Sequence, residues 1–160
     1  MSVTQELGNR IIMASAQEVI DAPPSEVWPF LSAIGTERVL IPGCTKSVLI
    51  EGQGKGALRR IYFGDVAFDE RILECDPTSY KFKYEVIEPS ASPARGVLGV
   101  VKLEPTGENQ TAISWATGAN GIAPEAREAI IQQAQHLCHG QIASLKMLVQ
   151  ATTNSFQMVE

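Results

Sequence analysis

The fold is decided by the stretch IDAPPSEVWPFL, residues 20–31, where the hydrophobic period of the chain changes. Residues 11–21 alternate weakly between apolar and polar side chains, which is typical of a strand. Prolines then open a segment with helical spacing, and proline is tolerated in a first helical turn because its missing N–H would be unpaired there. The sequence therefore predicts a strand followed by a short helix over about Pro24 to Ser32.

A weak second helix near Gly35–Leu40 precedes a series of predicted strands, separated by turns rich in glycine, proline and aspartate. The strands cover residues 45–51, 57–63, 67–75, 80–87, 96–104 and 111–118. In residues 80–87 aromatic and aliphatic side chains alternate with lysine and glutamate, so we expect one buried face and one solvated face. This part of the chain is therefore predicted to form an antiparallel sheet.

A long helix is predicted near the C-terminal end, from Pro124 to about Thr152. Its apolar residues, among them Leu137, Cys138 and Ile142, recur at helical spacing and form one stripe. An apolar stripe needs a partner layer, and the sheet is the available one. The order of elements therefore predicts an α+β fold in which a sheet and a long terminal helix share one interior.

Composition narrows the classes of partner. The 160 residues, 44% of them hydrophobic and 19% charged, suit a single domain over residues 1–160, with a core over about 12–150. The formal net charge of −5 argues against a nucleic-acid partner, because such proteins usually carry a basic face. No run approaches the roughly 18 apolar residues that span a bilayer, so we expect no membrane insertion.

Two features of the sequence bear on where in the cell the protein is located: its first ten residues and its cysteines. Residues 1–10 are polar and lack the apolar segment of a secretory signal. Three cysteines, Cys44, Cys75 and Cys138, stand at irregular spacing, and their odd number argues against a disulfide framework. We therefore expect a cytoplasmic protein.

Several fragments, in this order and spacing, carry a resemblance to a known superfamily. They are the opening IDAPPSEVW at residues 20–28, GALR at 56–59, ERILECD at 70–76, Tyr84 in its alternating strand, and ISW at 113–115. The chain resembles the START/SRPBCC superfamily, which includes birch-pollen allergens, abscisic acid receptors and polyketide cyclases. The resemblance implies the helix-grip fold: a bent antiparallel sheet of about seven strands around a long C-terminal helix, with two short helices after the first strand. It also implies a cavity for a hydrophobic small molecule.

The resemblance to the abscisic acid receptors places Glu70 inside that cavity. Strand alternation then places Phe68 and Ile72 inside as well. Arg59 matches a family arginine and would share the inner face of the preceding strand with Ile61 and Phe63. A buried charge needs a partner, so Arg59 and Glu70 are expected to pair across the hairpin. An adjacent arginine normally lowers the pKa of a carboxyl group, which favours a base or an anchor over an acid.

The other residues expected to line the cavity lie on the inner face of the sheet and on the apolar stripe of the long helix, which must meet in the interior. Helix arithmetic, at about 100° per residue, puts Arg127 within about 10° and Gln141 within about 35° of the centre of the stripe. An inward amide at mid-helix needs a hydrogen bond, which makes Gln141 a candidate ligand contact. The remaining expected lining residues are Phe82, Tyr84, Trp115, Leu137 and Ile142.

His136 and His139 suggest a metal site with Cys138, but the helix geometry opposes it. The histidines point about 175° and about 125° away from the stripe, whereas Cys138 lies within it. A zinc site usually has three or four ligands, and no further ones are apparent. We therefore expect no metal and no cofactor.

Three functions remain open. The first is a cofactor-independent cyclase or dehydratase acting on a polyketide, lipid or isoprenoid-like molecule, with Glu70, Arg59 and Tyr84 in acid–base roles. The second is a carrier or sensor that only binds such a molecule. The third, more distant, is a protein-interaction module. We expect a monomer or a homodimer.

Overall fold

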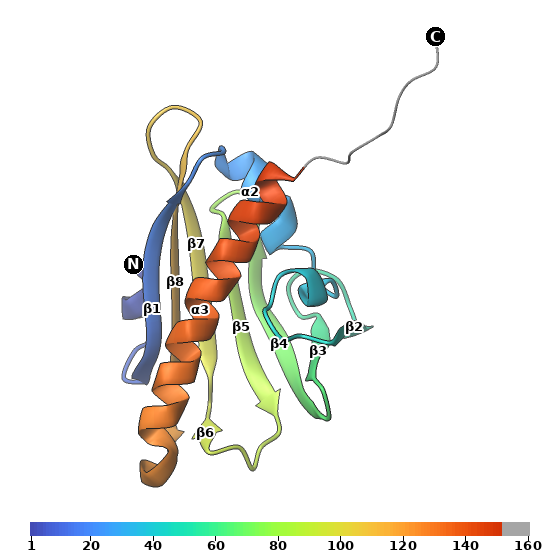
Figure 1. The fold of residues 1–160 in the computed structure, drawn as a ribbon, viewed down its shortest axis with the longest axis vertical. Helices are drawn as coiled ribbons and strands as arrows, with labels where there is room; N and C mark the ends of the chain where they lie inside the picture. Colours follow the sequence, from blue (N-terminus) through green and yellow to red (C-terminus); the bar gives the residue numbers. More distant parts are fainter. Residues whose placement is uncertain (152–160) are drawn as a thin grey trace.

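A computed structural model describes residues 1–151 of the chain. Its main sheet has seven antiparallel strands that curl around one long helix (Figure 1). The strands are β1 (Ile11–Ile20), β2 (Lys46–Glu51), β3 (Leu58–Phe63), β4 (Val66–Asp76), β5 (Lys81–Glu88), β7 (Leu98–Pro105) and β8 (Thr111–Ala119). Their order in the sheet is β1-β8-β7-β5-β4-β3-β2, and β6 (Ala94–Arg95) pairs with β9 (Gly121–Ile122) in a separate small sheet.

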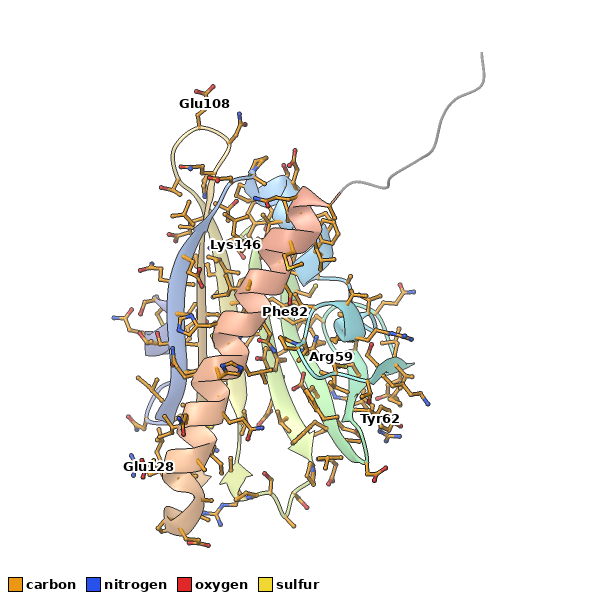
Figure 2. The ribbon with its side chains drawn as sticks, viewed as in Figure 1. Arg59, Tyr62, Phe82, Glu108, Glu128 and Lys146 are labelled. Atoms are coloured by element: carbon orange, nitrogen blue, oxygen red, sulfur yellow. The ribbon has the colours of Figure 1, made fainter. Side chains whose placement is uncertain are left out.

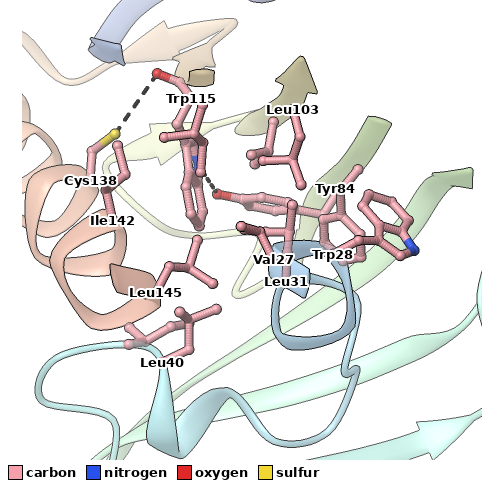
Figure 3. Close-up of a cluster of buried hydrophobic side chains, with 14 of the residues drawn as sticks. Val27, Trp28, Leu31, Leu40, Tyr84, Leu103, Trp115, Cys138, Ile142 and Leu145 are labelled. Atoms are coloured by element: carbon pink, nitrogen blue, oxygen red, sulfur yellow. Dashed lines mark hydrogen bonds between the residues drawn. The ribbon is translucent and has the colours of Figure 1, made fainter. Parts of the chain in front are cut away.

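The long helix α3 (Arg127–Gln150) follows the one-turn helix η2 (Pro124–Ala126) and crosses the concave face of the sheet. It packs mainly against β1 and against α2 (Pro24–Leu31), which lies beside its C-terminal end (Figure 1). The largest apolar cluster fills the space between these layers, and Trp28, Trp115 and Leu145 are among its buried side chains (Figure 3). The core therefore lies inside the curl of the sheet.

The predicted helix-grip architecture is confirmed, with about the expected strand boundaries. The weak second helix near Gly35–Leu40 is a single 3-10 turn, η1 (Glu37–Val39). Helix α3 ends at Gln150, and Thr152, its predicted end, lies outside the described residues. No helix within residues 1–151 is long and apolar enough to cross a membrane.

A short helix at the start of the chain, α1 (Val3–Glu6), was not predicted. Ser2 caps it, with its side chain accepting from Gln5 N, and Val3 and Leu7 pack on an apolar strip of β7 and β8. This strip lies on the convex face of the sheet, opposite α3. One helical turn is too short for a periodic pattern to be recognised, so the sequence alone carries no signal for it.

Candidate functional site

A small cavity lies between α3, the inner face of the sheet and the η1 segment. Its volume is about 30 Å³, enough for one or two water molecules. The expected cavity was larger, so this expectation was wrong for the described structure. The lining residues are Leu31, Glu37, Leu40, Ile41, Arg59, Glu70, Phe82, Tyr84, Trp115 and Gln141.

The cavity is small because one irregular segment packs close to the middle of α3. Leu40 and Ile41 follow η1 and project into the interior. The next residue, Pro42, lies against Gly140, where a Cβ atom would stand 2.8 Å from Pro42 Cγ. Gly140 therefore lets this segment approach the helix closely, and the side chains that it brings fill space that the periodicity of the sheet and helix leaves open.

Arg59 and Glu70 form the predicted ion pair. They are directly opposite each other in the β3–β4 register. Arg59 Nε donates to Glu70 Oε1 at 2.8 Å, and Arg59 Nη2 lies 2.7 Å from the same oxygen. The guanidinium also lies over the rings of Phe82 and Tyr84, at 5.3 and 5.0 Å from their centroids. Figure 2 labels Arg59 and Phe82 among the side chains of the molecule. Both charged side chains are at least nine-tenths buried, so each is held by its partners rather than by water.

Glu37 is a member of the site that the sequence analysis missed. Its Oε1 accepts from Arg59 Nη1 at 3.0 Å, and the backbone N–H of Gly35 donates to both carboxylate oxygens at 2.9 Å. Only 2% of the residue is exposed. The one available signal was an acidic residue between the apolar residues Ile34, Leu40 and Ile41, and Thr36 and Arg38 beside it weaken that signal. Glu37 makes the site a buried triad of two carboxyl groups and one guanidinium.

Burial raises the pKa of Glu70 above its ordinary value, although the Arg59 guanidinium opposes the shift. The Glu37 carboxylate adds to the shift because a second negative charge disfavours ionisation. The expectation of a lowered pKa was therefore wrong, since it counted the arginine but neither the depth of burial nor the second carboxyl group. Glu70 is consequently a better proton donor than the sequence indicated.

Tyr84 and Trp115 both line the cavity, and their polar atoms are hydrogen-bonded to each other. Trp115 Nε1 donates to the Tyr84 hydroxyl at 3.3 Å (Figure 3), which leaves the hydroxyl proton of Tyr84 for another acceptor. Burial raises the pKa of the Tyr84 phenol, so the group is neutral at physiological pH. Tyr84 faces Gly99 across the β5–β7 pair.

Gln141 projects from the middle of α3 into the cavity and is only 6% exposed. The expected inward direction of this side chain is confirmed. None of the hydrogen bonds within residues 1–151 involves its amide group, although a buried amide is usually paired. Gln141 thus brings hydrogen-bonding capacity to the cavity that the described part of the chain does not use.

Six of the expected lining residues do not border this cavity, and their contact with a ligand stays a prediction. Ile61, Ile72 and Ile142 are packed completely within the core. Phe63 and Phe68 contact each other edge to face at the end of the β3–β4 hairpin, with ring centroids 5.9 Å apart. Leu137 is half-buried at the edge of the core. Alternation identified the correct face, but the η1 segment determines which part of that face borders the cavity.

The two histidines are exposed on α3, as expected. His139 Nε2 lies 2.9 Å from Gln135 Nε2, and Gln135 in turn bonds both backbone groups of Ser15 at the edge of β1. Within residues 1–151 no group of three or more His, Cys, Asp or Glu side chains could hold a metal ion. Arg127, on the stripe by helix arithmetic, is exposed in the first turn of α3.

Comparison with known proteins agrees with this architecture. Residues 12–150 match the family model described as polyketide cyclase / dehydrase and lipid transport. No curated protein sequence matches the chain.

Solved structures with a similar fold include XoxI from Bacillus cereus, at 16% identity and a TM-score of 0.73, covering 85% of this chain and 94% of that one. Norcoclaurine synthase from Thalictrum flavum, in complex with dopamine and hydroxybenzaldehyde, is 18% identical with a TM-score of 0.68, and 87% of each chain is covered. Ara h 8.0201 is also 18% identical, with a TM-score of 0.69, covering 84% of this chain and 94% of that one. Identities this low show a shared fold alone.

Proposed function

Because the chain belongs to the family described as polyketide cyclase / dehydrase and lipid transport, we propose that it binds a hydrophobic small molecule through the cavity beneath η1. The apolar wall of Phe82, Trp115 and Leu31 would hold the body of the molecule. Its polar group would contact Gln141 and Glu70. Small-molecule sites typically combine such an apolar lining with a few placed polar groups.

The observation that carries this proposal is the amide of Gln141. Gln141 is only 6% exposed, and its amide makes no hydrogen bond within residues 1–151. The amide atoms are not among the fully buried unpaired side-chain atoms of these residues, Glu6 Oε2 and Thr117 Oγ1, so they border the cavity and are open to a partner in it. A leucine at this position would extend the apolar stripe of α3. An amide that borders the cavity and is not paired within residues 1–151 can bind the polar group of a ligand.

A ligand larger than two water molecules needs a wider cavity than the one described. The segment from Leu40 to Pro42 is the wall that can move, because it belongs to no strand or α-helix and touches α3 through Gly140. We expect the ligand to displace Leu40 and Ile41 outward while the sheet and α3 keep their places. The apolar surface of the ligand would then cover the part of the core that these two side chains cover in its absence.

A second candidate function is proton transfer within the same site, as a cyclase or dehydratase would need. The raised pKa of Glu70 favours it, because a carboxyl group that stays protonated nearer neutral pH can act as a general acid. The neutral hydroxyl of Tyr84 would orient the reacting molecule. A carrier or sensor would use the same groups as anchors only.

The test compares Gln141→Leu with Gln133→Leu, the same change at an exposed position of α3. Native mass spectrometry of the purified protein detects a retained molecule, and calorimetric titration with 2-naphthalenemethanol measures binding of a polar-headed apolar probe. We expect Gln141→Leu to weaken the probe by about tenfold, the loss of one hydrogen bond, and to leave the unliganded protein at least as stable as the wild type. Gln133→Leu should change neither the affinity for the probe nor the stability of the unliganded protein. Absence of both a retained molecule and any probe binding would refute the proposal.

A further inference from the structure

More acidic than basic side chains line the cavity. Its ten lining residues include two carboxyl groups, from Glu37 and Glu70, and one guanidinium, from Arg59. No lysine or histidine is among them. With both carboxyl groups ionised the triad carries one net negative charge, and with one of them protonated it is neutral. In neither state does the site have a surplus positive charge.

The single positive group already has its counter-charge. Each of the three guanidinium nitrogens of Arg59 lies within 3.0 Å of a carboxylate oxygen of Glu37 or Glu70. The rings of Phe82 and Tyr84 lie on one side of the guanidinium, with their centroids 5.3 and 5.0 Å from Arg59 Cζ and 6.2 Å from each other. A ligand anion would have to displace a buried carboxylate from Arg59, and that carboxylate would then be left without its counter-charge.

Glu37 is what removes Arg59 from the reach of a ligand. With Glu70 alone, Nη1 of Arg59 would have no carboxylate partner. An arginine that is paired on one side can still bind a second anion on the other. The backbone N–H of Gly35 holds both oxygens of Glu37, so the carboxylate is fixed in position beside the guanidinium. Glu37 thus closes the arginine to anions and adds a negative charge close to where the ligand would lie.

None of the groups that remain for a ligand is positively charged. Glu70 Oε1 receives both bonds from Arg59, so Oε2 is the oxygen left for a ligand: it accepts while the carboxyl group is ionised and can donate while the group is protonated. The amide of Gln141 can accept through its oxygen and donate through its nitrogen, and the Tyr84 hydroxyl can donate its proton. A hydroxyl or an amine satisfies this set, because it donates to a carboxylate and accepts or donates in a neutral bond.

We infer that the site selects molecules whose polar group is a neutral or cationic hydrogen-bond donor, a hydroxyl or an amine, and rejects carboxylates, sulfates and phosphates, with Glu37 as the specificity-determining residue. This inference rests on the proposed binding function. It excludes fatty acids and other acidic lipids from the class of ligands and retains phenols, alcohols and amines on an apolar body.

The experiment uses three probes with one apolar body: 2-naphthalenemethanol, 2-naphthylmethylamine and 2-naphthoate. Calorimetric titration of the wild-type protein at neutral pH should give binding of the alcohol or the amine that is at least about tenfold tighter than that of the carboxylate, since an unpaired anion next to a buried negative charge is strongly disfavoured. Equal or tighter binding of 2-naphthoate would overturn the inference while leaving the binding function intact. No binding of any of the three, in a protein that also retains no molecule in native mass spectrometry, would refute the binding function, and the inference with it.

Two variants test whether Glu37 sets the preference for the alcohol over the carboxylate. Glu37→Gln keeps a side-chain oxygen for Arg59 or Gly35 but removes one negative charge, and should narrow the preference for the alcohol over the carboxylate by about tenfold. Glu51→Gln is the matched control, because this carboxylate pairs with Arg71 on the exposed surface. It should leave the preference unchanged. An unchanged preference in a folded Glu37→Gln protein, verified by circular dichroism, would show that Glu37 does not set the selectivity.

Discussion

The ring of Tyr84 occupies the space that a side chain at Gly99 would fill: a Cβ atom built at Gly99 would overlap with the phenol ring. The two residues are directly opposite each other in neighbouring strands, β5 and β7. Glycine at this position therefore allows Tyr84 to lie flat across β7, with its hydroxyl next to the indole of Trp115.

The first prediction concerns this contact. Gly99→Ala should lower the free energy of unfolding by about 1–3 kcal/mol, the usual cost of an overpacked core, and displace the phenol from Trp115. Urea denaturation measures the stability, and tryptophan fluorescence follows the environment of the indole. In a Tyr84→Leu background the alanine should cost much less, because a shorter side chain can move aside. An equal cost in both backgrounds would contradict the proposed overlap.

The second prediction compares two adjacent arginines on opposite faces of β3. Arg59→Met removes the only counter-charge of two buried carboxyl groups and should cost about 3–5 kcal/mol of stability. Arg60→Met breaks a pair with Asp69 on the outer face, where 38% of the arginine side chain is exposed, and should cost far less. Urea denaturation of both variants decides the question. Similar losses of stability would mean that the buried ion pairs of Arg59 contribute no more to folding than the more exposed pair of Arg60.

The third prediction is a pH dependence due to Glu70. Because burial raises its pKa in the folded protein above the ordinary value of 4.5, its contribution to stability is fully present below pH 4.5 and is lost as pH rises through the folded pKa. Glu70→Gln cannot ionise, so its stability relative to the wild type should increase over that range. Denaturation curves of both proteins, taken from pH 4.5 upward, test this. A constant difference would show that the pKa of Glu70 is the same folded and unfolded.

The fourth prediction concerns the buried thiol of Cys138, which contacts the backbone carbonyl of Trp115. Burial raises the pKa of this thiol to about 12, and only the thiolate is nucleophilic. In the folded protein at pH 8, iodoacetamide should modify the half-buried Cys44 and Cys75 first and leave Cys138 unmodified until the protein unfolds. Peptide mass spectrometry locates the modified residues, and early modification of Cys138 would contradict its burial.

The fold could be predicted because its determinants are periodic. The alternation in residues 80–87 and the stripe of α3 both identify faces that must be covered, and the change of period at residues 20–31 sets the order of elements. The pairing of Arg59 with Glu70, which is confirmed, came from the resemblance to the abscisic acid receptors. The alternation and the stripe are different in kind. These features depend on residues close together in one element, which is why a single sequence contains them.

The parts that escaped prediction depend on irregular backbone. Glu37 lies in a single 3-10 turn, where no period indicates which side chains point inward. The volume of the cavity depends on how closely Pro42 approaches Gly140, a contact between residues 98 positions apart in the sequence. Gly140 looks in the sequence like a tolerated flaw in a helix. Its role becomes apparent only when the segment that packs on it is placed.

The short helix α1 has a practical consequence for handling the protein. Glu6 lies between Lys81 and Lys83 on the convex side of β5, and Leu7 is completely buried on the strip formed by Leu98 and Val100. Deleting the first eight residues would expose this strip to water and leave both lysines with the more distant carboxylate of Glu74. A protein shortened in this way should self-associate and elute early in size-exclusion chromatography, because exposed apolar strips of this kind promote association. Expression tags joined to Met1 should therefore carry a linker long enough to leave the cap at Ser2 undisturbed.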